Sequence, residues 1–90
     1  MFIVHYGGVV VNKRTKIGKN CTINAFVNIG ENYGGVPQIG DNCFIGPGVK
    51  IFGDIVIGNN VSIGANAVVN KSFPDNVIIA GIPAKIVRYK

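Results

Sequence analysis

The most regular feature of this sequence is an Ile or Val at every sixth position, with a single four-residue insertion. These positions are Val11, Ile17, Ile23, Ile29, Ile39, Ile45, Ile51, Ile57, Ile63 and Val69. The residue that follows is mostly Gly or Asn, and the residue two positions earlier is mostly small or aliphatic. A β-branched residue with this period is typical of the short strands of a parallel β-helix, where it fills the interior.

Three such hexads make one coil of a triangular prism, since each hexad supplies one short strand and one corner. The Gly or Asn either adopts a positive φ at the corner or permits a close approach of two backbones. The pattern therefore predicts an all-β chain, folded as a left-handed parallel β-helix. We expect a single domain over residues 1–90, with repeats over 5–74 and a C-terminal strand and tail over 75–90.

The regular spacing ends after Val69, and the following residues 70–76 have the composition of a turn. We expect a last strand over Val77–Ala80. Beyond it, residues 81–85 turn the chain away, and residues 86–90 form a short amphipathic tail.

The insertion has two consequences. It places residues 31–38 outside the prism as an external loop, which is either a binding element or a bulge without function. It also places Cys43 one coil after Cys21, close enough for a disulfide. The alternative is a pair of small core residues that stay reduced, and we favour that alternative because the expected location is the cytoplasm.

The composition agrees with an all-β chain that depends on partner subunits. Hydrophobic residues make up 48% of the 90 residues, charged residues 14%, and Leu is absent. A chain this short buries a small core, so association with other subunits is expected. No apolar run is long enough for a membrane span and the start does not read as a signal peptide, so we predict a cytoplasmic protein without membrane insertion.

The net charge of +5 points to an anionic ligand. The basic residues are dispersed and no nucleic-acid-binding motif accompanies them, so no nucleic-acid partner is predicted. A small ligand that carries phosphate fits better. The chain has one His and no C-x-x-C motif, so no metal site is predicted.

The hexads, together with three further motifs, resemble the bacterial hexapeptide-repeat acyltransferases. The motifs are the opening His-Tyr-Gly-Gly-Val-Val-Val at 5–11, the Gly-Gly loop and the closing Gly-Ile-Pro-Ala-Lys at 81–85. The chain is most similar to the serine O-acetyltransferase branch, which includes relatives that acetylate sugars of surface polysaccharides. This resemblance implies a homotrimer, acetyl-CoA in a groove between two prisms, and a small-molecule or saccharide acceptor.

The resemblance also implies that His5 is the general base. It would remove the proton of the acceptor hydroxyl as that oxygen attacks the thioester carbon directly, and imidazole titrates near neutral pH, at ~6.5 in model compounds. Backbone N–H groups of Gly7 or Gly8 are candidates to stabilise the oxyanion. The alternative is a His at the solvent edge of the end coil.

Cofactor contacts are carried over from the same family. Positions that match its groove-lining turns are Pro47, Ala65, Asn70 and Lys71, and those that match its phosphate-binding cations are Lys85 and Arg88. Small corner residues leave room for pantetheine, and cations suit the phosphates. The alternative for Lys71, Lys85 and Arg88 is that they are ordinary solvated charges.

The sequence also departs from the serine enzymes. Val4 stands where they carry Asp before the catalytic His, so Asp41, Asp54 or a neighbouring subunit would have to orient His5, and Val36 replaces a loop His. The loss of the loop His favours the sugar-acetylating relatives. We therefore predict an acetyl-CoA-dependent O-acetyltransferase acting on a sugar or serine-like hydroxyl. The alternative is a catalytically inactive or truncated β-helix that acts as a trimerisation or binding module.

Overall fold

A computed structural model describes residues 2–3 and 8–90, and its regular elements are all short strands. The first face of the prism is the sheet of β1 (Phe2–Ile3), β4 (Thr22–Ile23), β7 (Phe44–Ile45), β10 (Ser62–Ile63), β12 (Val77–Ala80) and β13 (Lys85–Tyr89). The second face is the sheet of β2 (Val10–Val11), β5 (Asn28–Gly30), β8 (Lys50–Phe52) and β11 (Val68–Val69). The third face is the sheet of β3 (Lys16–Ile17), β6 (Gln38–Ile39) and β9 (Val56–Ile57).

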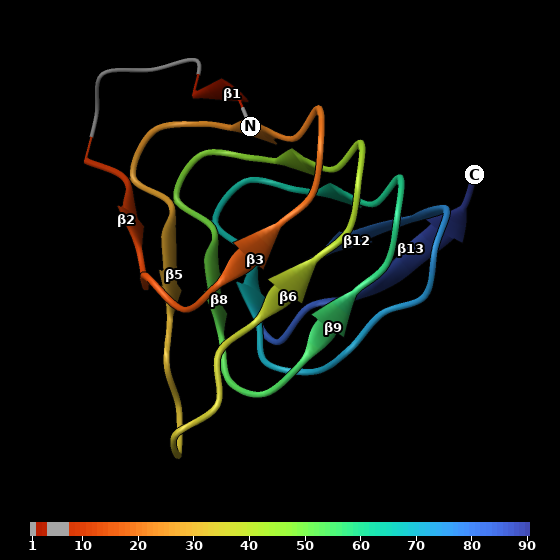
Figure 1. The fold of residues 1–90 in the computed structure, drawn as a ribbon. Helices are drawn as coiled ribbons and strands as arrows, with labels where there is room; N and C mark the ends of the chain where they lie inside the picture. The colour runs from red at the N-terminus through yellow and green to blue at the C-terminus, as the bar shows by residue number, and fades with distance from the viewer. Residues whose placement is uncertain (1, 4–7) are drawn as a thin grey trace.

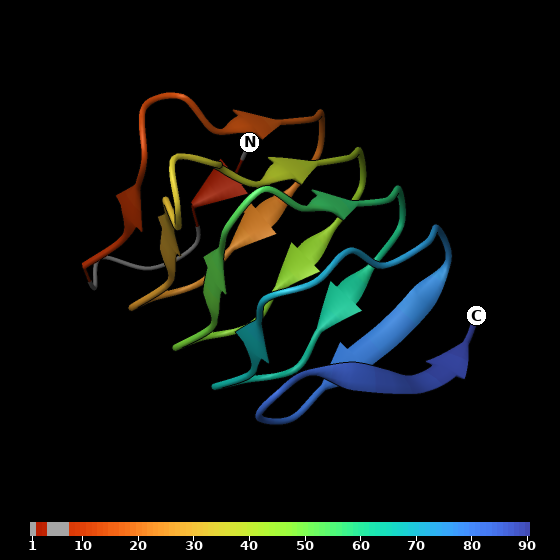
Figure 2. The same cartoon turned by 90° about the horizontal axis from the view of Figure 1, so that it is seen from below.

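Successive strands pass from one face to the next, and neighbours within a face belong to successive coils (Figure 1). The pairing is parallel throughout, apart from the antiparallel pair of β12 and β13. Figure 2 shows the coils stacked along one axis. The predicted left-handed parallel β-helix is confirmed. The described residues include no helix able to span a membrane.

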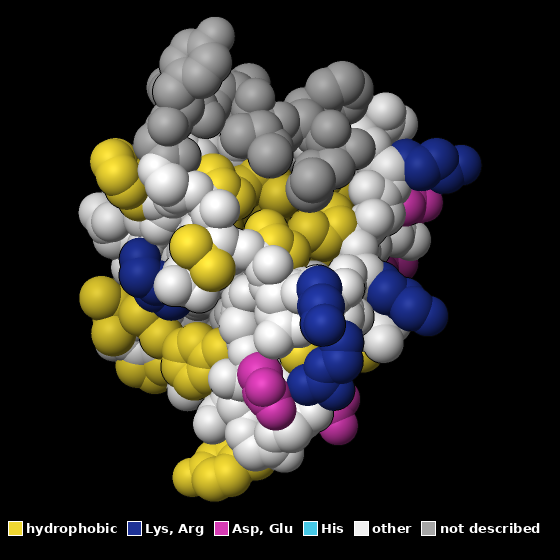
Figure 3. All heavy atoms as spheres, turned by 60° about the vertical axis from the view of Figure 1, so that its left-hand side comes forward, with side chains coloured by type: hydrophobic (Ala, Val, Ile, Leu, Met, Phe, Trp, Pro, Cys, Tyr) yellow, Lys and Arg dark blue, Asp and Glu magenta, His cyan; other side chains and the backbone are white. Residues whose placement is uncertain are grey.

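The interior of the prism is filled by the predicted hexad residues. From Ile23 to Val69 these side chains are at most 4% exposed, and the small residues two positions before them are buried as well. Val11 and Ile17, in the first coil, are only partly buried and pack against this core. Figure 3 shows hydrophobic side chains at the surface beside the atoms drawn in grey. The apolar column is therefore less completely buried in its first coil than in the later ones.

The repeat continues further than the sequence indicated. Ile63 pairs with Ile79 in the next coil, and Ile57 forms a parallel bridge with Phe73. The last coil is two residues shorter than the one before it, and its strand pairing extends past residue 74, where we expected the repeats to end. Phe73 is only 6% exposed, so its ring fills the interior place of an Ile although the spacing of six is broken.

The tail predicted over 86–90 is also part of the sheet. With Lys85 it forms β13, which runs antiparallel to β12 and extends the first face by one strand. All five of its residues are exposed. The antiparallel strand therefore terminates the stack of parallel coils.

The corner between the third and first faces, which we call the third corner, explains the Gly of the hexad. Gly18, Gly40 and Gly58 have no positive φ; instead, a Cβ on Gly40 would lie 2.8 Å from the backbone of Gly58. The positive φ falls two residues later, at Asn20, Asn42 and Asn60, and it recurs in the last coil at Asn76, two residues after Pro74. Of the two roles considered for the residue after the Ile, close backbone approach is the one adopted by these glycines.

The space left by each of these glycines is used by an Asx side chain of the following coil. Lys19 N–H donates to Asp41 Oδ1 at 2.8 Å, Asp41 N–H to Asn59 Oδ1 at 2.8 Å, and Asn59 N–H to Asp75 Oδ1 at 2.7 Å. These side chains form an Asx ladder along the third corner. The ladder satisfies corner amides that the strands do not pair.

The insertion leaves the prism at the corner between the second and third faces, which we call the second corner. It forms a small hairpin in which Asn32 and Gly35 exchange two backbone hydrogen bonds of 3.0 Å. The external loop is shorter than the predicted 31–38, because Pro37 is buried and Gln38 already belongs to β6.

The two cysteines lie in successive coils, as predicted, and their thiols are free and buried. Each thiol donates to a carbonyl of the next coil: Cys21 Sγ to Gly40 O at 3.1 Å and Cys43 Sγ to Gly58 O at 3.2 Å. Burial, chiefly, raises the pKa of Cys43 from 9.0 to about 11. The thiols serve the interior as small, weakly polar core groups.

Replacing Gly40 by Ala should destabilise the fold by about 1–3 kcal/mol, since the new methyl group overlaps the backbone of Gly58 and the side chain of Asn59. Urea unfolding measures the change. Gly30→Ala is the matched control, because its Cβ meets only Asn28 Oδ1 at 3.6 Å. Equal unfolding midpoints for the two variants would contradict the role given to the third corner.

Cys43 should resist thiol reagents in the folded protein. A pKa of about 11 in place of 9.0 lowers its thiolate fraction near pH 8 by about 100-fold. Because the folded value is the higher one, the thiol's contribution to stability is complete below pH 9 and is lost as the pH rises through 11. Maleimide labelling followed by mass spectrometry, with and without guanidinium chloride, measures this. Rapid labelling of the native protein at Cys43 would refute it.

Candidate functional site

His5, the predicted general base, lies outside the described residues, as does Gly7. The chain enters that segment from Ile3, which pairs with Ile23 on the first face. It leaves the segment at Gly8, which is exposed and precedes β2. The catalytic role of His5 therefore stays a prediction.

The edge between the first and second faces, which we call the first corner, brings together two of the predicted cofactor residues. Gly48 N–H donates to Ala25 O at 2.9 Å, and Asn66 N–H donates to Pro47 O at 2.9 Å. Ala25, Pro47 and Ala65 thus occupy equivalent positions in three successive coils. Their small side chains line one column along this corner.

The other predicted contacts are spread over the prism. Lys85 pairs with Ala80 at the start of β13, next to the first corner, whereas Arg88 pairs with Ile78 further along the first face. Asn70 and Lys71 follow β11 and lie at the second corner. Lys71 Nζ lies 5.5 Å above the ring of Phe73, which provides a cation–π partner within the chain.

The carboxylates considered as partners of His5 lie elsewhere as well. Asp41 belongs to the third corner, where its side chain accepts from Lys19 N–H. Asp54 follows β8 at the second corner. Neither residue is at the first corner.

Lys50 is a first-corner residue that the sequence reasoning missed. It points outward from β8, and its ammonium group donates to Gly48 O at 2.8 Å and to Phe26 O at 3.4 Å. It therefore holds a positive charge beside Pro47 and joins the corners of two coils. Nothing in the hexad pattern marks it, since the outward positions of the strands carry no periodic signal.

Phe26 is a second unexpected residue of this corner. It has a φ of 63°, at the position where the next two coils have Gly48 and Asn66. Its side chain is 66% exposed. The only trace in the sequence is that neither Gly nor Asn stands three residues after Ile23.

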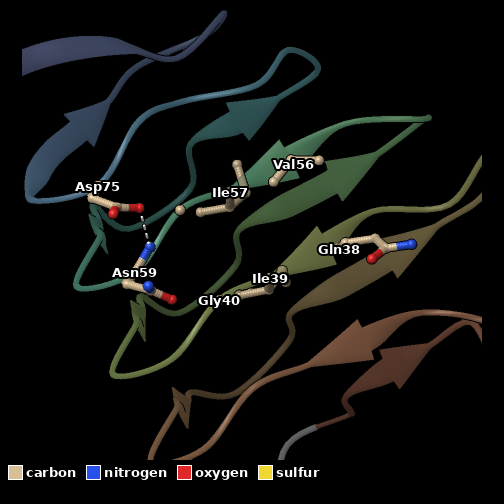
Figure 4. A pocket seen from close by; sticks show the side chains of 8 residues that line it. Gln38, Ile39, Gly40, Val56, Ile57, Asn59 and Asp75 are labelled. Carbon is tan, nitrogen blue, oxygen red and sulfur yellow. Dashed lines mark hydrogen bonds between the residues drawn. The ribbon is translucent and has the colours of Figure 1, made fainter.

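A hollow of about 310 Å³ lies elsewhere, on the third face (Figure 4). Its lining comprises Gln38, Ile39, Gly40, Val56, Ile57, Gly58, Asn59 and Asp75. Figure 4 shows Asn59 and Asp75 at one end and the side chains of Gln38 and Val56 at the other. None of the predicted site residues lines it, and it contains neither a cation nor a nucleophile. Its lining combines polar side chains with the exposed apolar side chain of Val56.

Three comparisons relate this chain to known proteins. Residues 37–71 match the family described as bacterial transferase hexapeptide (six repeats). The serine acetyltransferase of Staphylococcus xylosus is 44% identical over 98% of this chain and 43% of its own length. That of Staphylococcus epidermidis is 45% identical with the same coverage. The chain thus spans less than half the length of these relatives.

Solved structures give the same result. The crystal structure of serine acetyltransferase from Brucella abortus strain S19 superposes with a TM-score of 0.94 at 37% identity, covering 99% of this chain and 37% of that one. A serine acetyltransferase in complex with CoA superposes with a TM-score of 0.91 at 35% identity, covering 96% and 36%.

Proposed function

We propose that this chain, which matches the bacterial transferase hexapeptide family over residues 37–71 and is similar to serine acetyltransferases, is an acetyl-CoA-dependent O-acetyltransferase. The acceptor is a sugar or serine-like hydroxyl. The observation that carries the proposal is the first corner, where Pro47 and Ala65 stack in one column with Lys85 and Lys50 beside it.

The first corner suits the chemistry of acetyl-CoA. The small side chains of Ala25, Pro47 and Ala65 leave room for an extended pantetheine arm along the corner. Lys50 and Lys85 are exposed cations at its side, as a diphosphate requires. A relative with the same fold has been solved in complex with CoA.

His5 acts as the general base in this proposal. Its imidazole takes the proton of the acceptor hydroxyl while that oxygen bonds to the thioester carbonyl carbon. The carbon–sulfur bond then breaks, and the proton passes from the imidazole to the CoA thiolate. Backbone N–H groups near Gly8 would stabilise the negative charge that develops on the carbonyl oxygen.

The working unit we propose is a homotrimer with the third corner of each prism at the threefold axis. The turns of that corner are alike in every coil, with φ between 57° and 60° at the four Asn residues, whereas the hairpin projects from the second corner and Phe26 from the first. A prism placed in this way contacts its neighbours through the first and third faces.

Those two faces carry complementary features. Phe44 projects from the first face and is 47% exposed. The third-face hollow is lined from β6 and β9, and the coil order places β7 between these strands in height. A rotation about an axis parallel to the prism therefore brings Phe44 of one copy level with the hollow of the next. Val56, 58% exposed, provides an apolar floor for the ring.

Replacing His5 by Ala should lower acetyl transfer by about 10²–10⁴-fold, because the acceptor hydroxyl loses its base. Release of free CoA thiol, followed with a chromogenic disulfide, measures the rate. Circular dichroism checks that the fold is retained, and acetyl-CoA should still raise the melting temperature of the variant. CoA release at the wild-type rate would refute the assignment of His5.

Replacing Phe44 by Asp should abolish the trimer, because a carboxylate would be placed against Val56 and beside Asp75. Native mass spectrometry with and without acetyl-CoA measures the assembly, and the wild type is expected to bind three cofactors per trimer. Val10→Asp, 59% exposed on the second face, which points away from the neighbouring copies, is the control and should leave the trimer intact. A trimeric Phe44→Asp variant would overturn this packing, and a monomeric wild type would overturn the trimer.

A further inference from the structure

Two aromatic residues of the same coil have backbone conformations that normally favour Gly or Asn. The φ of Phe26 is 63° and that of Tyr33 is 51°. Burial does not offset this unfavourable geometry, because the side chains are 66% and 101% exposed. Exposed residues in strained conformations are a signal of function, since a ligand or partner then uses the side chain that the strain displays.

Tyr33 lies on a hairpin that is fixed by hydrogen bonds and an ion pair. It precedes Gly34, which also has a positive φ, at the tip of the hairpin closed by Asn32 and Gly35. Arg14 braces the hairpin by donating to Gly34 O at 3.2 Å and by pairing with Glu31 at 3.4 Å. Figure 1 shows this segment projecting beyond β5, away from the prism. The ring is therefore presented to something outside its own subunit.

The two rings cannot meet within one copy, because they lie at opposite ends of β5, one at the first corner and the other at the second. They do lie in one coil, and coils are only about 4.8 Å apart. In the trimer described above, the first corner of one copy lies beside the second corner of the next. Rotation about an axis parallel to the prism preserves height, so the two rings come level.

We infer that Phe26 of one copy and Tyr33 of the neighbouring copy form an aromatic clamp that binds a neutral saccharide acceptor at the first corner. The inference rests on the proposed function, since it needs both the trimer and the acceptor site. Aromatic faces offer rigid, apolar contact area that suits the C–H face of a sugar ring.

Charge at the hairpin agrees with a neutral acceptor. A free amino acid such as serine requires a cation for its carboxylate and an anion for its ammonium group. Arg14 and Glu31, the ionic groups bracing the hairpin, are paired with each other. Val36, which follows the hairpin, is apolar and partly buried. The hairpin therefore presents an aromatic ring with its nearby charges neutralised. On the Phe26 side, the ammonium group of Lys50 is already bonded to the carbonyls of Gly48 and Phe26.

The test uses Phe26→Ala and Tyr33→Ala in the full chain. Acetyl transfer is assayed with methyl glycosides of neutral hexoses and N-acetylhexosamines, and with L-serine. Each variant should raise the KM for the saccharide at least tenfold with little change in kcat or in the KM for acetyl-CoA. Tyr33→Phe and Phe26→Tyr should retain saccharide affinity. Tyr89→Ala, which removes an aromatic ring of similar exposure from the first-face strand β13, is the control: with its trimer verified by native mass spectrometry, it should keep the wild-type KM for the saccharide.

Mixing the two variants tests whether the rings come from different copies. In a trimer assembled from Phe26→Ala and Tyr33→Ala chains, one of the three interfaces regains both rings. Such trimers should recover about one third of the wild-type rate at low saccharide concentration. Recovery no greater than that of the parent variants would overturn the clamp between copies.

The remaining outcomes separate this inference from the proposed function. Transfer to serine alone would overturn the clamp and leave the transferase in place. Saccharide binding is measured independently by saturation-transfer NMR, with a signal expected for the wild type and its loss in both alanine variants. If none of the acceptors in the panel supports CoA release, the proposed function is refuted. If the wild type gives no NMR signal with the saccharide, the clamp is refuted.

Discussion

The hydrogen bond between a corner amide and the Asx side chain of the next coil is the constraint from which the rest of the prism follows. It requires Gly in the coil below, because a Cβ there would overlap the Asx oxygen and the neighbouring backbone. Together with the parallel strand pairing, it holds each coil in register with the last. The Ile residues can then stack in one interior column, so the apolar core depends on a polar contact at the edge of the fold.

Much of the fold can be predicted from the sequence because one local rule repeats. Each hexad carries its own strand, interior residue and corner, so the six-residue period locates nearly every buried Ile. The count fails in the last coil, where Phe73 replaces an Ile and two residues are missing. A residue count cannot register that a larger ring fills the same interior space. The edge strand β13 is missed for a related reason, since its side chains are all exposed and show no alternation.

The candidate site is less predictable than the fold. A period of six does not distinguish the three corners, so only the register shows that Pro47 and Ala65 share a column while Asn70 and Lys71 lie at another corner. Lys50 has no sequence signal because its role depends on carbonyls of two coils. In the sequence, Phe26 is marked only by the absence of Gly or Asn at its position. That absence becomes informative once the positive φ of Phe26 is known from the structure.

The antiparallel strand β13 limits how this architecture can change in length. A parallel coil presents the next coil with the edge it needs for pairing, so the stack could in principle grow at its C-terminal end. An antiparallel strand offers a different hydrogen-bonding pattern, and it ends that growth as a cap does in other repeat proteins. Duplication of a coil is thus compatible with the fold only upstream of β12. A longer relative built on this plan would gain its coils from within and keep the same final hairpin.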